Sequence, residues 1–539
     1  MIRNTLFVTV CALFVIACSA TPHEPPQASG ITFIHLNDTY RVGAVEDGTA
    51  GGFGRVVTLI RDLQAEGRDV RILHGGDFLY PSLESQLWNG MQIVEAFNFM
   101  DAVAPMYVVA GNHEFDPRTP DHLVDAVRAS EFDWLGDNYR FATGVEEVDG
   151  ALHEQFMLEA NGRKIGVFAL LLHAIDGGND RDYVPTEPDY FAHAQRVIEG
   201  LDAAGADLII GLTHLHLRTD LDIAALRAKY PQFMFIVGGH EHEPEFSELR
   251  DDRAAVMKGA SNARRIWRID VTFDGDGVPS MDAQMIDLDA TIVPDAEYAK
   301  IEDKWREMLL ERFPFLTATV GQAAVPLDAR EVTIRNEESN WGNFVVDQMR
   351  GAFGKPPADL AFINSGTLRI DDYIMDDVAF EDIGRTFGFS SYLRYMTLTG
   401  EEFRTVLEAG YRGTGPSKGY FPQVSGFRIC VDRSRAEGDR IVSLQVPLGE
   451  HWQEIEEKRK YGVVVPDFLY RGGDGYTFPQ GREASRPGSE LVYLVLDAII
   501  NAQAEGRAIG EPVDPNNQRI VILEEPGAAC WNGDGVRPT

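Results

Sequence analysis

The chain has 539 residues, of which 44% are hydrophobic and 25% are charged, so it carries enough apolar material for two or more globular domains. Its formal charge of −35, from 84 acidic and 49 basic residues, argues against nucleic acid or an anionic membrane surface as a general partner. An anionic ligand would therefore have to be held by a local site rich in cations.

The N-terminal segment, residues 1–17, has the pattern of an export signal. Arg3 precedes an almost wholly apolar run that is too short for a comfortable transmembrane helix. The stretch that ends at Cys18 resembles a bacterial lipobox, in which that cysteine would carry a lipid anchor; ordinary cleavage a few residues later is the alternative. Residues 18–30 would then form a tether. These features predict a periplasmic or cell-surface protein that meets a membrane only through the anchor.

Residues 31–294 alternate strand-like and helix-like runs, which indicates an α/β domain. Residues 295–318 predict a charged linker helix that Pro314 closes, residues 319–525 predict a second, smaller α/β domain, and residues 526–539 form a tail. The strand candidates in the first domain are ITFIHL, RILHGG, MYVVAG, KIGVFALLL, LIIGLTH and MFIVGGH.

Two cysteines, Cys430 and Cys530, remain once the export signal is removed. In an oxidising compartment an even pair can form a disulfide, although spacing alone does not show that the two meet.

Metal-binding side chains follow five predicted strands of the first domain, where open α/β sheets place their ligands. Taken singly, each has an ordinary explanation as a turn residue or a surface histidine, but five such strand ends together predict a metal site. Carboxylate, amide and imidazole groups without thiolates suit Zn²⁺, Mn²⁺ or Fe. The residues are Asp38, Asp77, Asn112, His214, His240 and His242.

The order D…GD…GNHE…H…GHxH resembles that of the calcineurin-like metallophosphoesterases over about residues 31–290. The resemblance implies a four-layer sandwich of two β-sheets flanked by helices. It also implies two metal ions and attack on phosphorus by a hydroxide that bridges them. Carried over to this chain, the resemblance implies that Asp77 bridges the two ions. One ion would be held by Asn112, His214 and His240, and the other would be held in part by Asp38 and His242.

Within GNHEFD, His113 and Asp116 resemble the catalytic pair of that family. The imidazole would stabilise the reacting phosphate or the leaving oxygen, and the carboxylate would orient the ring. The alternative is that these are polar residues that cap a helix start.

One ligand position departs from the family pattern, because Tyr40 stands where a histidine usually follows the first aspartate in NDxH. Tyr80 lies three residues after Asp77, a spacing that resembles the purple acid phosphatases, where a tyrosinate binds ferric iron. Three readings remain open: Tyr40 ligates, Tyr80 ligates, or water fills the gap. A tyrosine ligand would favour Fe³⁺.

Four motifs in the second domain, IRNEESNWGN, AFINSGTLRI, TFGFSSYLRYMTLTG and DFLYRGGDGY, resemble the substrate domain of the secreted 5′-nucleotidases and UDP-sugar hydrolases. The resemblance implies arginines that grip phosphate, a neighbouring amide, two aromatics that sandwich the base and an acceptor for ribose hydroxyls. An ordinary core or surface role is the alternative for each. The residues are, in that order, Arg335 and Arg369, Asn364, Phe389 and Phe468, and Asp474.

The sequence therefore predicts an α/β dinuclear metal phosphohydrolase, with Zn, Mn or Fe as cofactor, that removes phosphate from 5′-nucleotides. Cyclic nucleotides and nucleotide-sugar diphosphates are further candidate substrates. The alternatives are a general phosphoesterase that acts on other organic phosphates, and a non-catalytic surface lipoprotein that binds a ligand. The sequence leaves the oligomeric state open.

Overall fold

The computed structural model describes residues 30–531, apart from residues 118, 173–182, 186–188, 414–417, 450, 482–483, 486, 524 and 526. The predicted export signal, the anchor at Cys18 and nearly all of the tether lie outside the described residues. Among the helices that are described, each is too short or too polar to span a bilayer.

The N-terminal domain contains two six-stranded sheets with parallel strands at the centre. Antiparallel strands flank both sides of the second sheet and one side of the first, whose other edge strand is also parallel. The parallel strands are almost continuously apolar and buried, because both faces of such a sheet are covered. The first sheet has the order β14-β13-β1-β2-β3-β4, with β1 (Ile31–Leu36), β2 (Asp69–His74), β3 (Met106–Val109), β4 (Asp133–Leu135), β13 (Arg265–Phe273) and β14 (Pro279–Asp287). The second has the order β11-β12-β10-β9-β7-β6, with β6 (Phe156–Ala160), β7 (Arg163–Leu171), β9 (Leu208–His214), β10 (Phe233–Gly238), β11 (Glu245–Ser247) and β12 (Ala255–Lys258).

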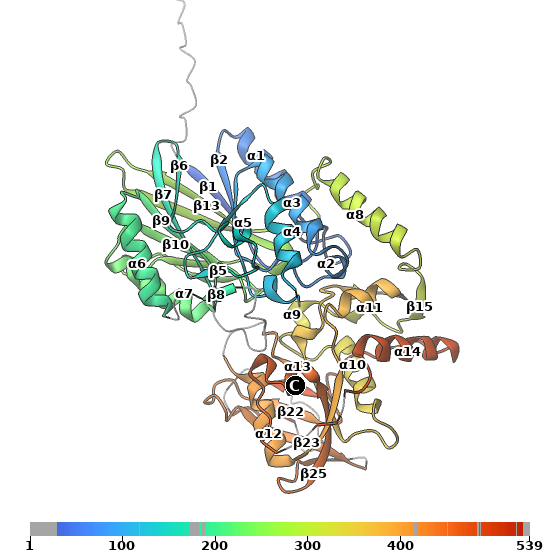
Figure 1. The fold of residues 1–539 in the computed structure, drawn as a ribbon. Helices are drawn as coiled ribbons and strands as arrows, with labels where there is room; N and C mark the ends of the chain where they lie inside the picture. Colours follow the sequence, from blue (N-terminus) through green and yellow to red (C-terminus); the bar gives the residue numbers. More distant parts are fainter. Residues whose placement is uncertain are drawn as a thin grey trace, which may run out of the picture.

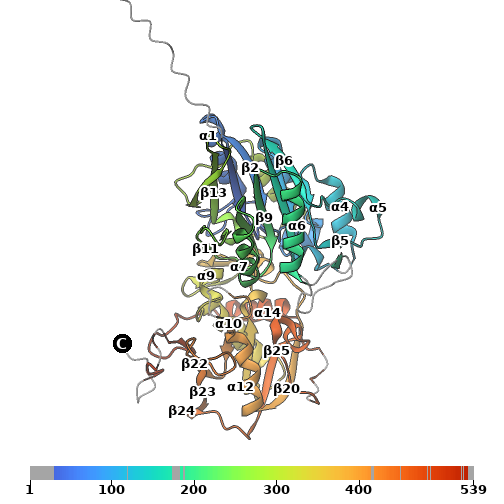
Figure 2. The same cartoon turned by 90° about the vertical axis from the view of Figure 1, so that its left-hand side faces the viewer.

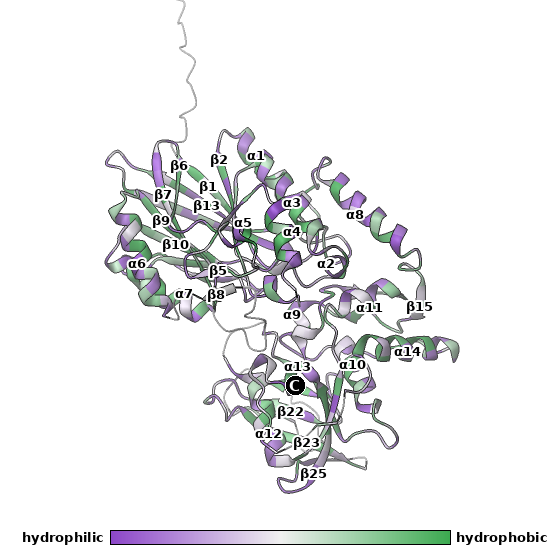
Figure 3. Ribbon diagram, viewed as in Figure 1, coloured by the Kyte–Doolittle hydropathy of each residue, from purple (hydrophilic) through white to green (hydrophobic). Residues whose placement is uncertain are grey.

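The two sheets pack face to face, and the rings of Phe33 on β1 and Phe235 on β10 meet across the interface at 5.7 Å. Helices cover the outer face of each sheet, so the predicted four-layer sandwich is confirmed (Figures 1 and 2). Figure 3 shows that the strands are mostly apolar and that the outer helices carry both hydrophobic and hydrophilic residues. This is expected when one face of a helix contacts a sheet and the other face meets water. The covering helices are α1 (Phe53–Ala65), α3 (Met91–Val103) and α4 (Asp121–Ala129) on one side, and α6 (Tyr190–Ala203) and α7 (Leu217–Ala224) on the other. The shorter elements of this domain are α2 (Leu83–Trp88), α5 (Glu146–Asp149), β5 (Tyr139–Phe141) and β8 (Tyr183–Pro185).

The linker forms helix α8 (Ala299–Arg312), which lies against the N-terminal domain (Figure 1). Its Trp305 packs its ring 5.3 Å from that of Trp88 and donates a hydrogen bond to Glu95. The helix starts a few residues later than the linker boundary at residue 295 because Asp295 accepts hydrogen bonds from the amides of Glu297 and Tyr298 in the turn that precedes it.

The C-terminal domain is smaller and built around two four-stranded sheets, β20-β25-β17-β21 and β24-β23-β22-β26 (Figure 1). A disulfide joins Cys430 on β22 to Cys530, so the two cysteines that remain after the predicted export signal do meet. The strands are β15 (Thr319–Gln322), β16 (Leu327–Asp328), β17 (Leu360–Asn364), β18 (Tyr373–Ile374), β19 (Asp377–Ala379), β20 (Leu393–Thr399), β21 (Pro422–Ser425), β22 (Arg428–Val431), β23 (Ile441–Leu448), β24 (His451–Glu454), β25 (Lys460–Pro466) and β26 (Ile520–Ile522). The helices are α9 (Glu331–Ile334), α10 (Asn340–Gly351), α11 (Phe380–Thr386), α12 (Gly400–Glu408), α13 (Asp467–Tyr470) and α14 (Leu491–Ala504).

Candidate metal centre and active site

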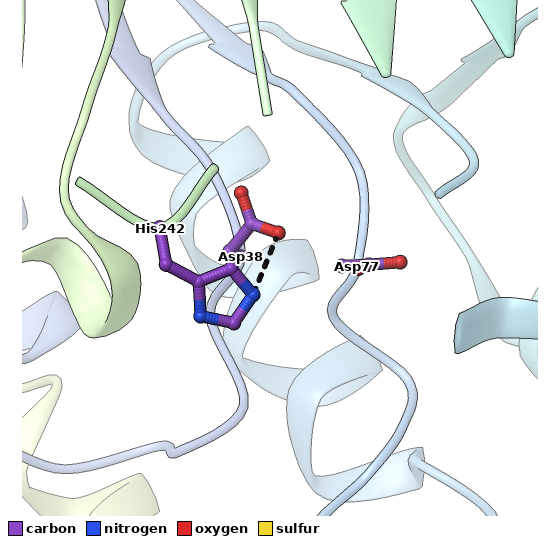
Figure 4. A group of neighbouring side chains, drawn as sticks. All are labelled: Asp38, Asp77 and His242. Atoms are coloured by element: carbon purple, nitrogen blue, oxygen red, sulfur yellow. Dashed lines mark ion pairs between the residues drawn. The ribbon is translucent and has the colours of Figure 1, made fainter. Parts of the chain in front are cut away.

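The loops after five neighbouring strands of the two sheets meet at one end of the sandwich and bring the predicted metal ligands together. Asp38, Asp77 and His242 each offer an oxygen or nitrogen atom, and these atoms lie within 4.8 Å of one another (Figure 4). The Nε2 atom of His242 lies 3.3 Å from Asp38 Oδ1. These side chains follow β1, β2 and β10, so the carboxyl ends of parallel strands gather them.

The other three predicted ligands lie next to this group. Asn112 Oδ1 lies 3.1 Å from His214 Nε2 and 3.2 Å from His240 Nδ1. His214 Nε2 is also 3.4 Å from Asp77 Oδ2. Asp77 therefore lies near both subsets, within 4.8 Å of the ligand atoms of Asp38 and His242 and 3.4 Å from His214, as a bridging ligand must.

The backbone at four of these residues is in the left-handed region, with φ of 52° at Asp38, 60° at Asp77, 87° at His240 and 65° at His242. Residues other than glycine adopt such φ values uncommonly, and strained positions concentrate at functional sites. Gly111 shows how tightly the loops approach, because a Cβ there would lie 2.2 Å from Asp77 Oδ1. The loops thus hold their polar side chains in one place at a conformational cost.

The chemistry of this cluster fits cations. Asp38 is fully buried, and its Oδ1 atom has no hydrogen-bond partner among the described residues. Burial raises the pKa of Asp38, against the opposing influence of His242 and His214. Burial disfavours a charged His214, yet the carboxylate of Asp77 raises the pKa of that imidazole to about 9. Buried carboxylates that draw protons onto neighbouring histidines are suited to bind metal ions in their place.

Glu114 is a site residue that our sequence reasoning missed, although it stands inside the GNHEFD motif. Its carboxylate accepts hydrogen bonds from the backbone amides of Asp77, Phe78 and Leu79 in one ligand loop and of Gly111 in another. Burial, with a further contribution from Asp77, raises the pKa of Glu114 to about 7. This side chain holds two ligand loops together. Its position next to Asn112 and His113 was the available signal.

Tyr40 lies at the metal-ligand cluster. Its hydroxyl is 3.3 Å from Asp77 Oδ2 and 2.9 Å from His242 Nε2. Burial, with a further contribution from Asp77, raises the pKa of the Tyr40 hydroxyl well above its ordinary value. Tyr80 instead places its ring beside that of His122, at 6.1 Å. Of the two candidate tyrosines, the structure brings Tyr40 into contact with the predicted ligands.

His113 lies between the two domains. Its Nδ1 is 2.6 Å from Asp116 Oδ2, and its backbone amide donates to Asp77 Oδ1. Its Nε2 lies 3.0 Å from Nη2 of Arg369, which belongs to the C-terminal domain. Phe389, also from that domain, packs its ring 5.8 Å from the imidazole. Residues that the sequence assigned separately to catalysis and to substrate binding therefore meet at one point.

The remaining predicted substrate residues lie in the C-terminal domain at varying distances from this point. Asn364 donates a 2.7 Å hydrogen bond to Asp474, and burial raises the pKa of that carboxyl. Arg335 is buried and bonds to Glu331. Phe468 on α13 is partly buried against the domain core, whereas Phe389 packs its ring against that of His113.

A buried lysine supports the ligand loops from behind, and it too was missed in the sequence. The ammonium of Lys258 pairs with Asp220 at 3.0 Å and with Glu241 at 2.5 Å. It also donates to the carbonyl oxygens of Leu215 and Gly239, each directly beside a predicted metal-ligating histidine. A lysine in a hydrophobic strand offers no pattern that would reveal this role.

Comparison with known proteins agrees with this architecture. Residues 31–244 match the calcineurin-like phosphoesterase family and residues 319–480 match the 5′-nucleotidase C-terminal domain family. The trifunctional nucleotide phosphoesterase protein YfkN of Bacillus subtilis is 25% identical over 95% of this chain, which spans 36% of that longer protein. A 5′-nucleotidase of Diplobatis ommata is 24% identical, with 83% of each chain covered.

Solved structures share the fold. A 5′-nucleotidase precursor from Thermus thermophilus superposes with a TM-score of 0.77 at 23% identity, over 92% of this chain and 100% of that one. The sulfate thiohydrolase SoxB of the same genus superposes with a TM-score of 0.71 at 17% identity, over 95% and 99%. Both domain families thus match in order along one chain, and the protein belongs to the calcineurin-like phosphoesterases that carry a 5′-nucleotidase C-terminal domain, a family of metal-dependent phosphoester hydrolases.

Proposed function

We propose that the protein removes phosphate from 5′-nucleotides outside the cytoplasm, with cyclic nucleotides and nucleotide-sugar diphosphates as further candidate substrates. The observation that carries the proposal is the 3.0 Å contact between Arg369 of the C-terminal domain and His113 beside the metal ligands. The Nη1 atom of Arg369 is buried without a hydrogen-bond partner among the described residues. A buried guanidinium with a spare N–H suits an anionic substrate group.

Six residues would hold two metal ions. When bound, the ions would neutralise the charge of the phosphate and lower the pKa of a water molecule. The position of Asp77 supports it as the shared ligand, since it lies 3.4 Å from His214 and within 4.8 Å of Asp38 and His242. One subset is Asp38 and His242; the other is Asn112, His214 and His240.

His113 is the residue of the chain that would donate a proton or stabilise negative charge during the reaction. Asp116 accepts a hydrogen bond from Nδ1–H and orients the ring, so Nε2 faces the side where Arg369 would hold the phosphate. From that position the imidazole can stabilise developing charge or give a proton to the leaving oxygen. His113→Ala should lower phosphate release from AMP by about 10²- to 10⁴-fold while Mn²⁺ still binds. Unchanged turnover would contradict this role.

Nucleotide specificity would come from the C-terminal domain. The Asn364–Asp474 pair offers a polar contact for ribose, and Phe389 and Phe468 offer aromatic faces for a base. The double change Phe389→Ala with Phe468→Ala should raise KM for AMP far more than KM for p-nitrophenyl phosphate. Equal effects on both substrates would favour a general phosphoesterase, a reading that the shared fold with a sulfate thiohydrolase makes worth testing.

We propose further that Tyr40 completes the metal site in place of the histidine usual in the family. The support is its hydroxyl contact with Asp77 and His242, which Tyr80 does not make among the described residues. Protein loaded with Fe³⁺ should then show a visible tyrosinate absorption band. Tyr40→Phe should abolish the band, and Tyr80→Phe should leave it intact. The opposite pattern, or no band in either protein, would reject Tyr40 as a ligand.

Export and lipid anchoring at Cys18 remain proposals. The disulfide between Cys430 and Cys530 supports export, because such bonds persist in oxidising compartments, and the lipobox-like stretch before Cys18 supports the anchor. The full chain expressed in bacteria should appear in the membrane fraction, and Cys18→Ser should move it to the soluble periplasmic fraction. Recovery of both proteins in the cytoplasm would refute export.

A further inference from the structure

The C-terminal domain contributes a carboxylate to a metal ligand of the N-terminal domain. Glu331, the first residue of α9, accepts a 2.7 Å hydrogen bond at Oε2 from Nδ1 of His242. The same oxygen accepts a 2.9 Å hydrogen bond from the hydroxyl of Ser261, also in the N-terminal domain. The side chains of Glu331 and His242 are 2% and 4% exposed, so water does not compete for this bond.

This bond determines which nitrogen of His242 faces the other ligands. With Nδ1–H donated to Glu331, Nε2 presents its lone pair toward Asp38 Oδ1, 3.3 Å away, and the Tyr40 hydroxyl, 2.9 Å away. A carboxylate that holds the second nitrogen of a metal-binding histidine fixes the tautomer and increases the basicity of the ligand. Glu331 stands in that relation to His242.

A second acidic residue docks the same segment onto the N-terminal domain. The amide of Glu331 donates to Asp371 Oδ1, and Asp371 Oδ2 accepts from the amide group of Asn262 at 3.0 Å. The guanidinium of Arg264 lies 3.5 Å from the same carboxylate. Arg335 bonds to the other oxygen of Glu331. The buried charge of Glu331 is thus shared between a metal ligand and an arginine proposed to bind substrate.

Because the two partners of the bond belong to different domains, it exists only while the domains are docked. We propose that Glu331 is a positioning residue that couples docking of the C-terminal domain to metal affinity at the subsite formed by Asp38 and His242. The inference rests on the proposed dinuclear centre. When the domains separate, His242 loses its orienting partner and this subsite binds its ion more weakly. By thermodynamic reciprocity, an ion bound there favours the docked arrangement.

The test is Mn²⁺ binding to the metal-free full chain by titration calorimetry. Wild-type protein should show two binding events. Glu331→Ala should weaken one of them by about 10- to 100-fold and leave the other unchanged. Glu331→Gln, which keeps an acceptor oxygen without the charge, should restore part of the loss. Circular dichroism should show that each variant is folded. Ser261→Ala, which removes the neutral bond to the same oxygen together with a bond that Ser261 accepts from Arg264, should have a smaller effect in the same direction.

A matched control separates this role from docking in general. Arg385 pairs with Glu84 across the domains, at 2.7 Å, without contact with a predicted ligand. Glu84→Gln should leave both Mn²⁺ affinities within about threefold of wild type. Small-angle scattering should show that Mn²⁺ compacts wild-type protein more than Glu331→Ala.

Two results would overturn the proposal: wild-type Mn²⁺ affinities in Glu331→Ala, or an equal loss in Glu84→Gln and Glu331→Ala. Failure of the proposed function is distinguishable, because wild-type protein that binds Mn²⁺ but releases no phosphate from AMP would reject nucleotidase activity and leave this coupling intact.

Discussion

Lys258 provides the most direct test of how the fold supports the candidate metal centre. Its ammonium is fully buried and lies 3.0 Å from Asp220 and 2.5 Å from Glu241. The change Lys258→Met keeps the approximate length of the side chain and removes the charge, three hydrogen bonds and the ion pair with Asp220. The carboxylates of Asp220 and Glu241 then stay buried without the cation that they face in the wild-type protein.

Removal of one partner from a buried ion pair costs about 3–5 kcal/mol, because the remaining charge stays desolvated. Asp220 keeps a bond from Thr213 and Glu241 keeps one from the amide of Leu217, so both retain a neutral donor. We therefore expect Lys258→Met to lower the free energy of unfolding by about 4 kcal/mol at neutral pH, roughly a thousandfold in the folding equilibrium.

The loss should depend on pH in a defined direction. Burial opposes the charge on Lys258, but Asp220 and Glu241 raise its pKa above the ordinary value. The wild-type contribution is therefore fully present below the unfolded lysine pKa and is constant between pH 5 and pH 8. In the variant the pKa values of the two carboxyls rise, so the folded state keeps protons that the unfolded chain has released. Stability of the variant should fall as pH rises above about 4, and the difference from wild type should be larger at pH 8 than at pH 5.

Urea unfolding of the metal-free full chain, followed by circular dichroism at pH 5 and pH 8, measures both effects. Lys304→Met is the matched control, because Lys304 is half exposed and pairs with Glu95 at the surface. That change should cost less than about 1 kcal/mol at either pH. A Lys258→Met protein within about 1 kcal/mol of wild type, with no dependence on pH, would show that charge does not hold this cluster together.

Three further predictions concern activity, covalent structure and pH. Chelation of divalent metals should abolish phosphate release from AMP, and Mn²⁺ should restore it; full activity in chelator would exclude a metal-dependent reaction. Cys430→Ser should lower the free energy of unfolding by about 2–5 kcal/mol, because a long loop is no longer closed by the disulfide. Urea unfolding of the variant and of wild type, with and without reductant, measures this loss. Equal unfolding midpoints would show that the bond does not form in solution. Burial raises the pKa of Asp137 to about 7, so its contribution to stability is present below pH 4 and lost as pH rises through 7. Asp137→Asn should reduce the slope of unfolding free energy against pH by up to about 1.4 kcal/mol per unit in that window, and an unchanged slope would place the titration elsewhere.

The candidate metal-binding residues could be proposed from the sequence because their signal is local. Each ligand follows an apolar strand, and parallel strands bring such positions to one edge of a sheet. Asp38, Asp77 and His242 lie at three strand ends, and the structure places their atoms within 4.8 Å. The sandwich follows from the same alternation of strands and helices.

The choice between Tyr40 and Tyr80 could not be made this way. Both lie two or three residues from a ligand, and either side chain could have turned toward the centre. The left-handed backbone at Asp38 is a feature of the folded loop. Only the packing of the loops sends Tyr40 to Asp77 and His242 and Tyr80 to His122.

Strand periodicity and loop chemistry are properties of short segments, so the two-domain α/β architecture and the candidate metal-binding side chains can be predicted from the sequence. The tertiary structure decided which of these act together. Glu331 meets His242 across 89 residues, and Arg369 meets His113 across 256. Neither contact can be predicted from the local sequence, because each depends on how one domain docks against the other. That docking results from many buried contacts between distant parts of the chain.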